Sequence, residues 1–295
     1  MQKTGEILRK IRHLELNTRK LVDSAFAGQY HSAFKGRGMN FDEVREYQPG
    51  DEIRSIDWNV TARSGTPHIK KYTEERELAV MLVVDVSASG SYGSVTLSKR
   101  ELAAEVACLL AFSAIRNNDK VGLLLFADGV EHFLPPKKGR QHVLRLIRDI
   151  LYFEPQGRGT NPAGALTYLN RVLSRRAVVF LLSDFLAPDF SRELGVTARR
   201  HDLVAIPISD PCEESLPDIG IVNFEDAETG EQIELDTSKA ANREAFAGLA
   251  ASRYARLDQQ LRKLRVDTIP LASNADYLPP LRAFFRQRER RIHMS

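Results

Sequence analysis

The chain has 295 residues, of which 43% are hydrophobic and 27% are charged, ordinary proportions for a soluble globular protein. The net charge is only +3, and the basic clusters lack the interleaved aromatic residues of a nucleic-acid-binding surface, so we expect no nucleic-acid partner. The two cysteines, Cys108 and Cys212, exclude a disulfide scaffold and a Cys-rich zinc site, and they suit a reducing compartment.

The first residues, through Lys20, carry recurring charges and no apolar stretch of the signal-peptide kind. The longest apolar runs, such as 78–84 and 177–182, are far too short to cross a bilayer. We therefore expect a cytoplasmic protein with no membrane span.

Residues 6–24 place apolar side chains at helical spacing, which predicts an amphipathic helix. Residues 25–77 differ, because they contain several glycines, a Pro-Gly-Asp turn signal at 49–51 and short mixed runs. Two short strands are expected there, at 41–47 and 68–73. Residues 1–77 are thus expected to form an N-terminal helix followed by a small β-rich module.

From residue 78 the character of the chain changes. The run from Leu78 to Val84 is apolar throughout, as in a strand covered on both faces of a parallel sheet. The Asp128-Gly129 pair is a strong hairpin signal, so residues 130–134 are expected to return as an antiparallel edge strand. Further buried strands are expected at 121–126, 177–182 and 203–208. A fifth strand is expected at 219–224, with 231–235 as its short return strand, and a last short strand at 266–269. Helices are expected at 98–116, 141–152, 162–173 and 239–264.

Strands that alternate with helices predict an α/β fold in which a mostly parallel sheet is doubly wound, with helices on both faces. This fold would occupy residues 78–295, with helices at its C-terminal end. In such sheets ligands bind just outside the carboxyl ends of the strands. Polar residues at those ends are therefore the first candidates for a functional site.

Hard-oxygen side chains follow two of the expected strands. Asp85, Ser87 and Ser89 form an Asp-x-Ser-x-Ser motif after the first strand, and alternate side chains of an extended segment point to the same side. Thr160 ends a Gly-rich loop that runs into a helix, and Asp184 follows another buried strand. Two carboxylates and three hydroxyls, without His or Cys, suit Mg²⁺, Mn²⁺ or Ca²⁺ and argue against zinc.

These residues match a known motif at all five positions. The pattern Asp85-x-Ser87-x-Ser89, then Gly-Thr160-Asn, then Ser-Asp184 resembles the metal-ion-dependent adhesion site (MIDAS) of von Willebrand factor A domains. The resemblance implies that these residues hold a divalent metal directly or through water. It also implies an open coordination position for an Asp or Glu from a partner protein.

Residues upstream of the metal motif carry a second resemblance. Their motifs are Phe34-Lys35-Gly36-Arg37-Gly38-x-x-Phe41, Arg45-Glu46-Tyr47-x-Pro49-Gly50-Asp51-Glu52-x-Arg54-x-Ile56-Asp57-Trp58, Thr61-Ala62-Arg63 and Glu74-Glu75. The chain is similar to the bacterial family called domain of unknown function 58, which pairs such a module with a von Willebrand factor A domain of Rossmann-like type. Its members are typically encoded beside MoxR-type AAA+ ATPases. The resemblance therefore implies a metal-dependent adaptor that binds such an ATPase or its client.

Two groups of residues have plainer interpretations. Asp210 also follows an expected strand, but Ser-Asp-Pro is an ordinary turn, so we expect it to support the site at most. Arg54, Asp57, Trp58 and Arg63 could form a partner surface. We favour a structural role for them instead, with ion pairs and a packed indole that hold a small sheet together.

Enzyme interpretations are weaker, so we expect a protein-protein interaction protein and no enzyme. Ser32-x-x-Lys35 stands without the other motifs of penicillin-recognising enzymes, and no P-loop or Gly-x-Ser-x-Gly elbow occurs. The alternative is a Mg²⁺-dependent phosphatase or phosphotransfer enzyme, which also carries Asp at strand ends. Such sites normally need a second Asp or a Lys beside the nucleophile, and the residues next to Asp85 in sequence are small and uncharged.

Overall fold

The computed structural model of the chain describes residues 2–22, 26–34, 40–73, 77–91, 93, 97–225 and 230–293. The chain divides into two compact units, one of residues 1–33 with 78–295 and the other of residues 34–77. The first helix, α1 (Gln2–Leu21), packs against two helices of the larger unit. Residues 1–77 are thus divided between the two units, because the apolar face of α1 is buried on the α/β unit.

The larger unit contains a central sheet with strand order β10-β7-β6-β3-β4-β5, and β11 also pairs with β7. All pairings are parallel except that of β5, which returns antiparallel to β4 as the hairpin signal predicts. The two central strands, β3 and β6, are apolar and almost wholly buried, as expected for strands covered on both faces. The strands are β3 (Ala79–Asp85), β4 (Lys120–Phe126), β5 (Val130–Lys137), β6 (Val178–Ser183), β7 (Asp202–Ser209), β10 (Asp267–Thr268) and β11 (Leu271–Ala272).

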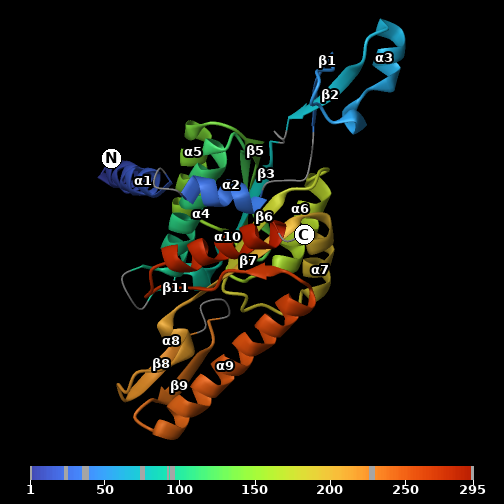
Figure 1. The fold of residues 1–295 in the computed structure, drawn as a ribbon. Helices are drawn as coiled ribbons and strands as arrows, with labels where there is room; N and C mark the ends of the chain where they lie inside the picture. The colour runs from blue at the N-terminus through green and yellow to red at the C-terminus, as the bar shows by residue number, and fades with distance from the viewer. Residues whose placement is uncertain are drawn as a thin grey trace. The chain divides into compact units, whose positions relative to one another are not determined.

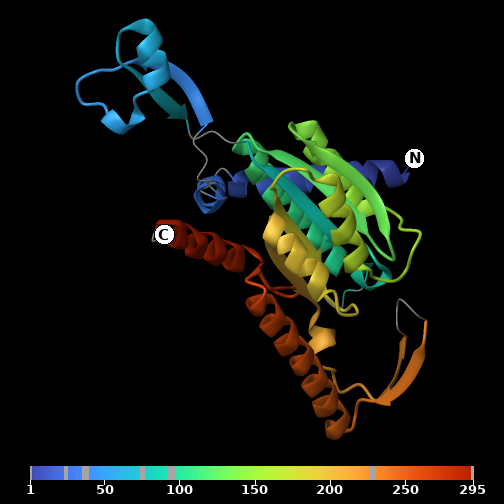
Figure 2. The ribbon, with the colours of Figure 1, turned by 90° about the vertical axis from the view of Figure 1, so that its right-hand side faces the viewer.

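Helices cover both faces of this sheet, with α4 and α5 on one side and α6 and α7 on the other (Figures 1 and 2). The doubly wound, mostly parallel α/β fold is therefore confirmed. The helices α4 and α6 each begin at a side-chain cap. Ser98 and Glu101 form a capping box at the start of α4, and Asn161 caps α6 just before Pro162. The remaining bounds are α2 (Ala27–Phe34), α4 (Lys99–Arg116), α5 (Arg140–Tyr152), α6 (Pro162–Val172), α7 (Ser191–Arg200) and α10 (Leu278–His293).

A separate hairpin follows β7 and the short helix α8 (Pro211–Glu214). Its strands, β8 (Ile221–Glu225) and β9 (Gln232–Asp236), pair with each other and with no other strand among the described residues. The return strand expected at 231–235 is therefore confirmed, but the expectation that 219–224 adds a fifth strand to the central sheet is wrong. The residues of β8 alternate between exposed and half-buried positions, whereas a central strand needs apolar residues on both faces. The long helix α9 (Ala240–Lys263) leads back to the sheet, where β10 and β11 pair in parallel with successive parts of β7.

The smaller unit is built on an antiparallel pair, β1 (Asn40–Glu46) and β2 (His68–Thr73), with the short helix α3 (Trp58–Ser64) between them. Asp57 is buried and caps α3 by accepting two backbone N–H groups. Arg45 binds Asp51 through two hydrogen bonds, of 2.9 and 2.7 Å. Trp58, however, is 67% exposed, so the expectation that its indole packs within the module is wrong. The family motif residues Lys35, Gly36, Arg37, Gly38, Glu74 and Glu75 lie outside the described residues.

Candidate metal centre

Asp85 and Asp184 meet at the carboxyl edge of the central sheet. Strands β3 and β6 run parallel, with Val84 opposite Leu182, so the residues that follow them emerge side by side. Each carboxylate is 8% exposed. Ser183 donates its hydroxyl to Oδ2 of Asp85 at 2.8 Å, which joins the ends of the two strands. The sheet register therefore brings both predicted carboxylates to one site.

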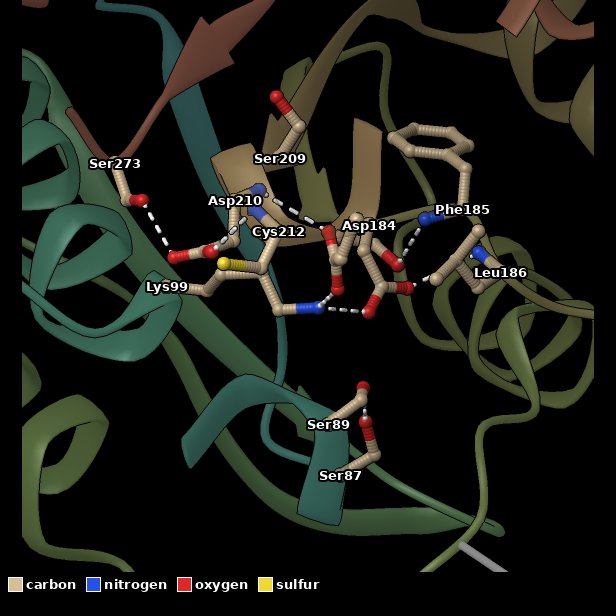
Figure 3. A network of polar contacts seen from close by, with 12 residues as sticks. Ser87, Ser89, Lys99, Asp184, Phe185, Leu186, Ser209, Asp210, Cys212 and Ser273 are labelled. Carbon is tan, nitrogen blue, oxygen red and sulfur yellow. Dashed lines mark hydrogen bonds and ion pairs between the residues drawn. The ribbon is translucent and has the colours of Figure 1, made fainter. Parts of the chain in front are cut away.

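The two serines lie in the turn that follows β3. The backbone N–H of Ser87 donates to Oδ1 of Asp85 at 2.9 Å, which folds the chain back over the carboxylate. A short 3-10 helix, η3 (Ala88–Ser91), then brings the hydroxyl of Ser89 within 3.0 Å of that of Ser87 (Figure 3). The Asp-x-Ser-x-Ser spacing thus gathers its side chains as predicted, through a turn in place of an extended loop. Tyr92 and Ser94, which follow this turn, lie outside the described residues.

The Gly-rich loop approaches the same turn through its backbone. The N–H of Ala88 donates to the carbonyl of Arg158 at 3.0 Å, and Asp128 accepts the N–H of Arg158 at 2.9 Å. Gly157 packs so closely on the Asp128 side chain that a Cβ would overlap it. Thr160 is half-buried at the end of this loop, two residues beyond Arg158. The bond between Ala88 and Arg158 therefore joins this loop to the turn that carries the serines, but neither Thr160 nor Ser87 is among the residues that line the cavity described below.

A buried lysine that the sequence analysis did not identify also belongs to this edge. Nζ of Lys99 lies 2.6 Å from Oδ2 of Asp184 and 2.5 Å from Oε1 of Glu213, and Lys99 is only 3% exposed (Figure 3). Lys99 is the first residue of α4, where the helix dipole disfavours a cation. A lysine directly after the Ser98 cap was therefore the available signal, because such a position calls for nearby carboxylates.

Asp210 is hydrogen-bonded to Glu213, the second ion-pair partner of Lys99. It is fully buried, accepts the N–H of Cys212 at 3.0 Å and the hydroxyl of Ser273 at 2.8 Å, and so caps the short helix α8. Its own N–H donates to the carboxylate of Glu213 at 3.1 Å. The same carboxylate accepts a hydrogen bond from Nζ of Lys99. Asp210 therefore orients Glu213, and it does not line the cavity described below.

The charges at this edge do not balance. When ionised, Asp85, Asp184, Asp210 and Glu213 contribute four negative charges against the two positive charges of Lys99 and Arg100, which leaves −2. Burial and the neighbouring charge of Asp184 raise the pKa of Asp85 from 3.8 to about 6. Burial lowers the pKa of Lys99, but the two adjacent carboxylates outweigh it and raise that pKa overall. The edge therefore carries an excess of negative charge that a divalent cation would neutralise.

A cavity of about 20 Å³ lies at the centre of these groups, lined by Asp85, Ser89, Lys99 and Asp184 among others. This volume accommodates one water-sized ligand. Within the described part of the chain, no group of three or more His, Cys, Asp or Glu side chains is arranged to hold a metal. A cation here would thus depend on hydroxyl and water oxygens as well as on Asp85 and Asp184, and such a donor set fits Mg²⁺ or another hard cation.

Comparison with known proteins decides the family. The model of the family described as "Protein of unknown function DUF58" matches residues 43–256. The chain belongs to this family. The match spans most of the module and the α/β unit as far as α9, including all five candidate metal residues. Uncharacterized protein Rv1480 of Mycobacterium tuberculosis is a relative of this DUF58 protein, 34% identical over 95% of the chain and 89% of the relative.

Further similarities are more distant. Uncharacterized protein YeaD of Bacillus subtilis is 25% identical over 41% of the chain and 27% of its own length. Among solved structures, the conserved hypothetical protein BatB from Bacteroides thetaiotaomicron is 17% identical with a TM-score of 0.48, over 74% of this chain and all of that one. The VWA domain of SpRpn10 is 12% identical with a TM-score of 0.38, over 72% and 95% of the two chains. In the described part of this DUF58 protein, no helix combines the length and the apolarity that a membrane crossing requires.

Proposed function

We propose that this DUF58 protein binds one divalent cation, Mg²⁺ or else Mn²⁺ or Ca²⁺, and uses it to bind a partner protein in the cytoplasm. The cation is held by Asp85, Ser87, Ser89, Thr160 and Asp184, and no reaction is catalysed. The observation that carries this proposal is the excess of negative charge around a cavity of one-ion size at the sheet edge.

The mechanism follows from charge and coordination. Asp85 and Asp184 at most neutralise a divalent ion, and the hydroxyls add no negative charge. Lys99 reduces the negative charge further, because it is paired with Asp184 at 2.6 Å. A cation in this setting still attracts an anionic ligand, and a partner carboxylate can displace a bound water. We propose an Asp or Glu of the partner as that ligand.

The partner we propose is a MoxR-type AAA+ ATPase or a client that such an ATPase remodels. This step rests on membership of the DUF58 family, whose resemblance implies the pairing, and on the absence of a P-loop in this sequence. The chain would then act as an adaptor that selects what the ATPase engages.

Thr160→Ala tests this mechanism, because it removes a candidate ligand without altering charge or the module. Purified MoxR-type ATPase would be titrated onto the immobilised chain at saturating Mg²⁺ and again in chelator. We expect Thr160→Ala to weaken Mg²⁺-dependent binding and to leave the circular dichroism spectrum unchanged. Unaltered affinity in this variant, with weakened affinity in Arg54→Ala or Arg63→Ala, would move the interface to the module and leave the metal a structural role.

A second candidate function, Mg²⁺-dependent phosphotransfer, is favoured by one observation. Lys99 supplies the ammonium that such a site needs beside an Asp, at 2.6 Å from Asp184. Against it, a cavity of about 20 Å³ is filled by a water-sized ligand and has no room for a phosphoryl group. Hydrolysis of p-nitrophenyl phosphate in Mg²⁺, lost in Asp184→Asn, would favour the enzyme over the adaptor.

A further inference from the structure

A groove of about 270 Å³ adjoins the candidate metal centre and shares Asp184 with it. One wall is the loop that follows Asp184, residues 185–190, and the other is the C-terminal half of α9, residues 253–260. The groove is slightly smaller than the roughly 300–1,000 Å³ of drug-sized ligand sites, so its size suits a few side chains of a peptide.

The floor of this groove is apolar and fixed in shape. Phe185 and Phe190 are 7% and 6% exposed, and their rings stack with centroids 6.1 Å apart. Leu257 of α9 packs against the same core cluster. Phe185 has a φ of +58°, a left-handed conformation that bulky residues rarely adopt. The buried ring therefore holds the loop in one conformation, and the groove has a preformed apolar floor.

The metal centre and the loop wall are connected through Asp184. Its Oδ1 accepts the backbone N–H of Leu186 at 3.0 Å, while Oδ2 accepts Lys99 at 2.6 Å. The N–H of Phe185 donates to the hydroxyl of Ser183 at 3.1 Å, and that hydroxyl also binds Asp85. A ligand bound at the metal would therefore lie at the start of the groove, within reach of both walls.

The charge along the groove differs between its walls. On the loop wall, Asp184 is paired with Lys99, and Asp189 accepts hydrogen bonds from Ser191 and Gln260. On the α9 wall, Arg253 and Arg256 are exposed and form no ion pair within the residues that the structure describes. Asp189 also forms no ion pair within the described residues, but the two arginines outnumber it, so the groove carries a net positive charge above an apolar floor.

We propose that this groove binds an acidic, apolar segment of the partner, next to the carboxylate that the metal receives. Apolar side chains of the segment pack on Phe185, Phe190 and Leu257, and its second carboxylate pairs with Arg253 or Arg256. This inference rests on the proposed function, because it names the chemistry of the partner at the same site. It assigns to α9 the role of selecting acidic partners.

The probe is a fluorescein-labelled synthetic peptide that alternates Asp with Leu between Gly-Ser ends, followed by fluorescence anisotropy with the full chain in Mg²⁺. We expect Arg253→Glu with Arg256→Glu to weaken binding at least tenfold, which is about 1.4 kcal/mol. Lysine at both positions should retain most of the affinity, because it keeps the charge. The matched control is Arg262→Glu with Lys263→Glu, the same charge reversal on α9 but outside the groove lining, and it should bind like wild type.

Mg²⁺ titration calorimetry on the same variants separates this inference from the proposed function. The Arg253 and Arg256 variants should bind Mg²⁺ as wild type does. Peptide affinity that is unchanged in the charge-reversed variant, or no Mg²⁺-dependent peptide binding by a wild type that binds Mg²⁺, would overturn the groove proposal and leave the metal site standing. A wild type that binds no Mg²⁺ would overturn both. Peptide binding that is blocked by self-association, seen by ultracentrifugation, would assign the groove to a second copy and overturn the proposal.

Discussion

The two edges of the central sheet handle buried charge in opposite ways. At the amino edge, Arg288 bridges Asp202 and Asp267, the first residues of β7 and β10, and Arg291 also pairs with Asp267. In this cluster two carboxylates thus face two guanidinium groups, while the buried Asp119 just before β4 accepts hydrogen bonds from the hydroxyl of Tyr30 and the N–H of Leu78. At the carboxyl edge, the ammonium of Lys99 pairs with Asp184 and Glu213, and the four carboxylates of the edge, with Asp85 and Asp210, outnumber Lys99 and Arg100.

The difference separates a structural role from a functional one. A balanced set of partly buried charges needs no further ion, and the removal of one member leaves its partners without compensation. An excess of buried negative charge costs stability until a cation arrives, and the rise in the pKa of Asp85 to about 6 is the sign of that cost. We therefore interpret the ion pairs of Arg288 and Arg291 at the amino edge as stabilising contacts, and the carboxyl edge as a ligand site. Substitutions at the two edges should have opposite effects on the free energy of unfolding.

The largest effect is expected at the amino edge. Arg288→Ala leaves Asp202 and Asp267 without their bridging cation and also removes the bond to the carbonyl of Ala33 at 2.9 Å. Breaking a fully buried pair costs about 3–5 kcal/mol, and because these aspartates are about one-quarter exposed, we expect a loss of about 2–3 kcal/mol. Urea denaturation measures it, with exposed Arg290→Ala on the same helix as the control. A loss no larger than that of the control would show that the ion pairs of Arg288 do not stabilise the fold.

A smaller effect of opposite sign is expected at the carboxyl edge, in chelator. The pKa of Asp85 is about 6 in the folded chain against about 3.9 unfolded, so the folded state binds more protons between these values. Stability from this group is therefore complete below pH 4, is lost as pH rises to 6, and stays lost at pH 7. Asp85→Asn removes a cost of up to about 3 kcal/mol but weakens two hydrogen bonds, so we expect a gain of about 1–2 kcal/mol at pH 7.

The same denaturation experiment run at pH 4 provides the internal check. There the gain from Asp85→Asn should largely vanish, because the wild-type carboxyl is already protonated. A variant that is less stable than wild type at pH 7 in chelator would show that the carboxyl edge is balanced like the amino edge.

Much of the fold could be predicted, because short apolar runs and turn signals in the local sequence mark the central strands and the hairpin. The apolar runs that became β3 and β6 sit in the sheet as expected, and the Asp128-Gly129 signal marked the antiparallel edge strand. Prediction failed at β8 because a short run containing Ile221 and Phe224 has the composition of a core strand but the alternation of an exposed hairpin. It also failed at Trp58, since composition alone does not reveal what covers an indole.

The candidate site likewise has residues that the sequence grouped correctly and residues that only the structure brings together. Asp85, Ser87 and Ser89 share one turn, so their spacing was enough to group them. Lys99 and Glu213 meet across more than a hundred residues of sequence, and no local pattern encodes such a contact. Charge arithmetic on the predicted carboxylates, Asp85 and Asp184, already gives −2, and the structure leaves this sum unchanged while it adds further charged groups of both signs. The structure shows that Lys99 compensates part of the edge and that Glu213 adds to its negative charge.

The most direct test of the account is calorimetric titration of Mg²⁺ into metal-stripped protein. The wild type should bind one Mg²⁺ per chain, and Asp85→Ala with Asp184→Ala should abolish the binding. Asp119→Asn is the matched control, because Asp119 is a buried carboxylate at the amino edge that bonds to the N–H of Leu78 at 2.9 Å, and it should bind Mg²⁺ like wild type. Equal binding by the wild type and the double variant, or loss of binding in the control alone, would contradict the assignment of the carboxyl edge as the metal centre.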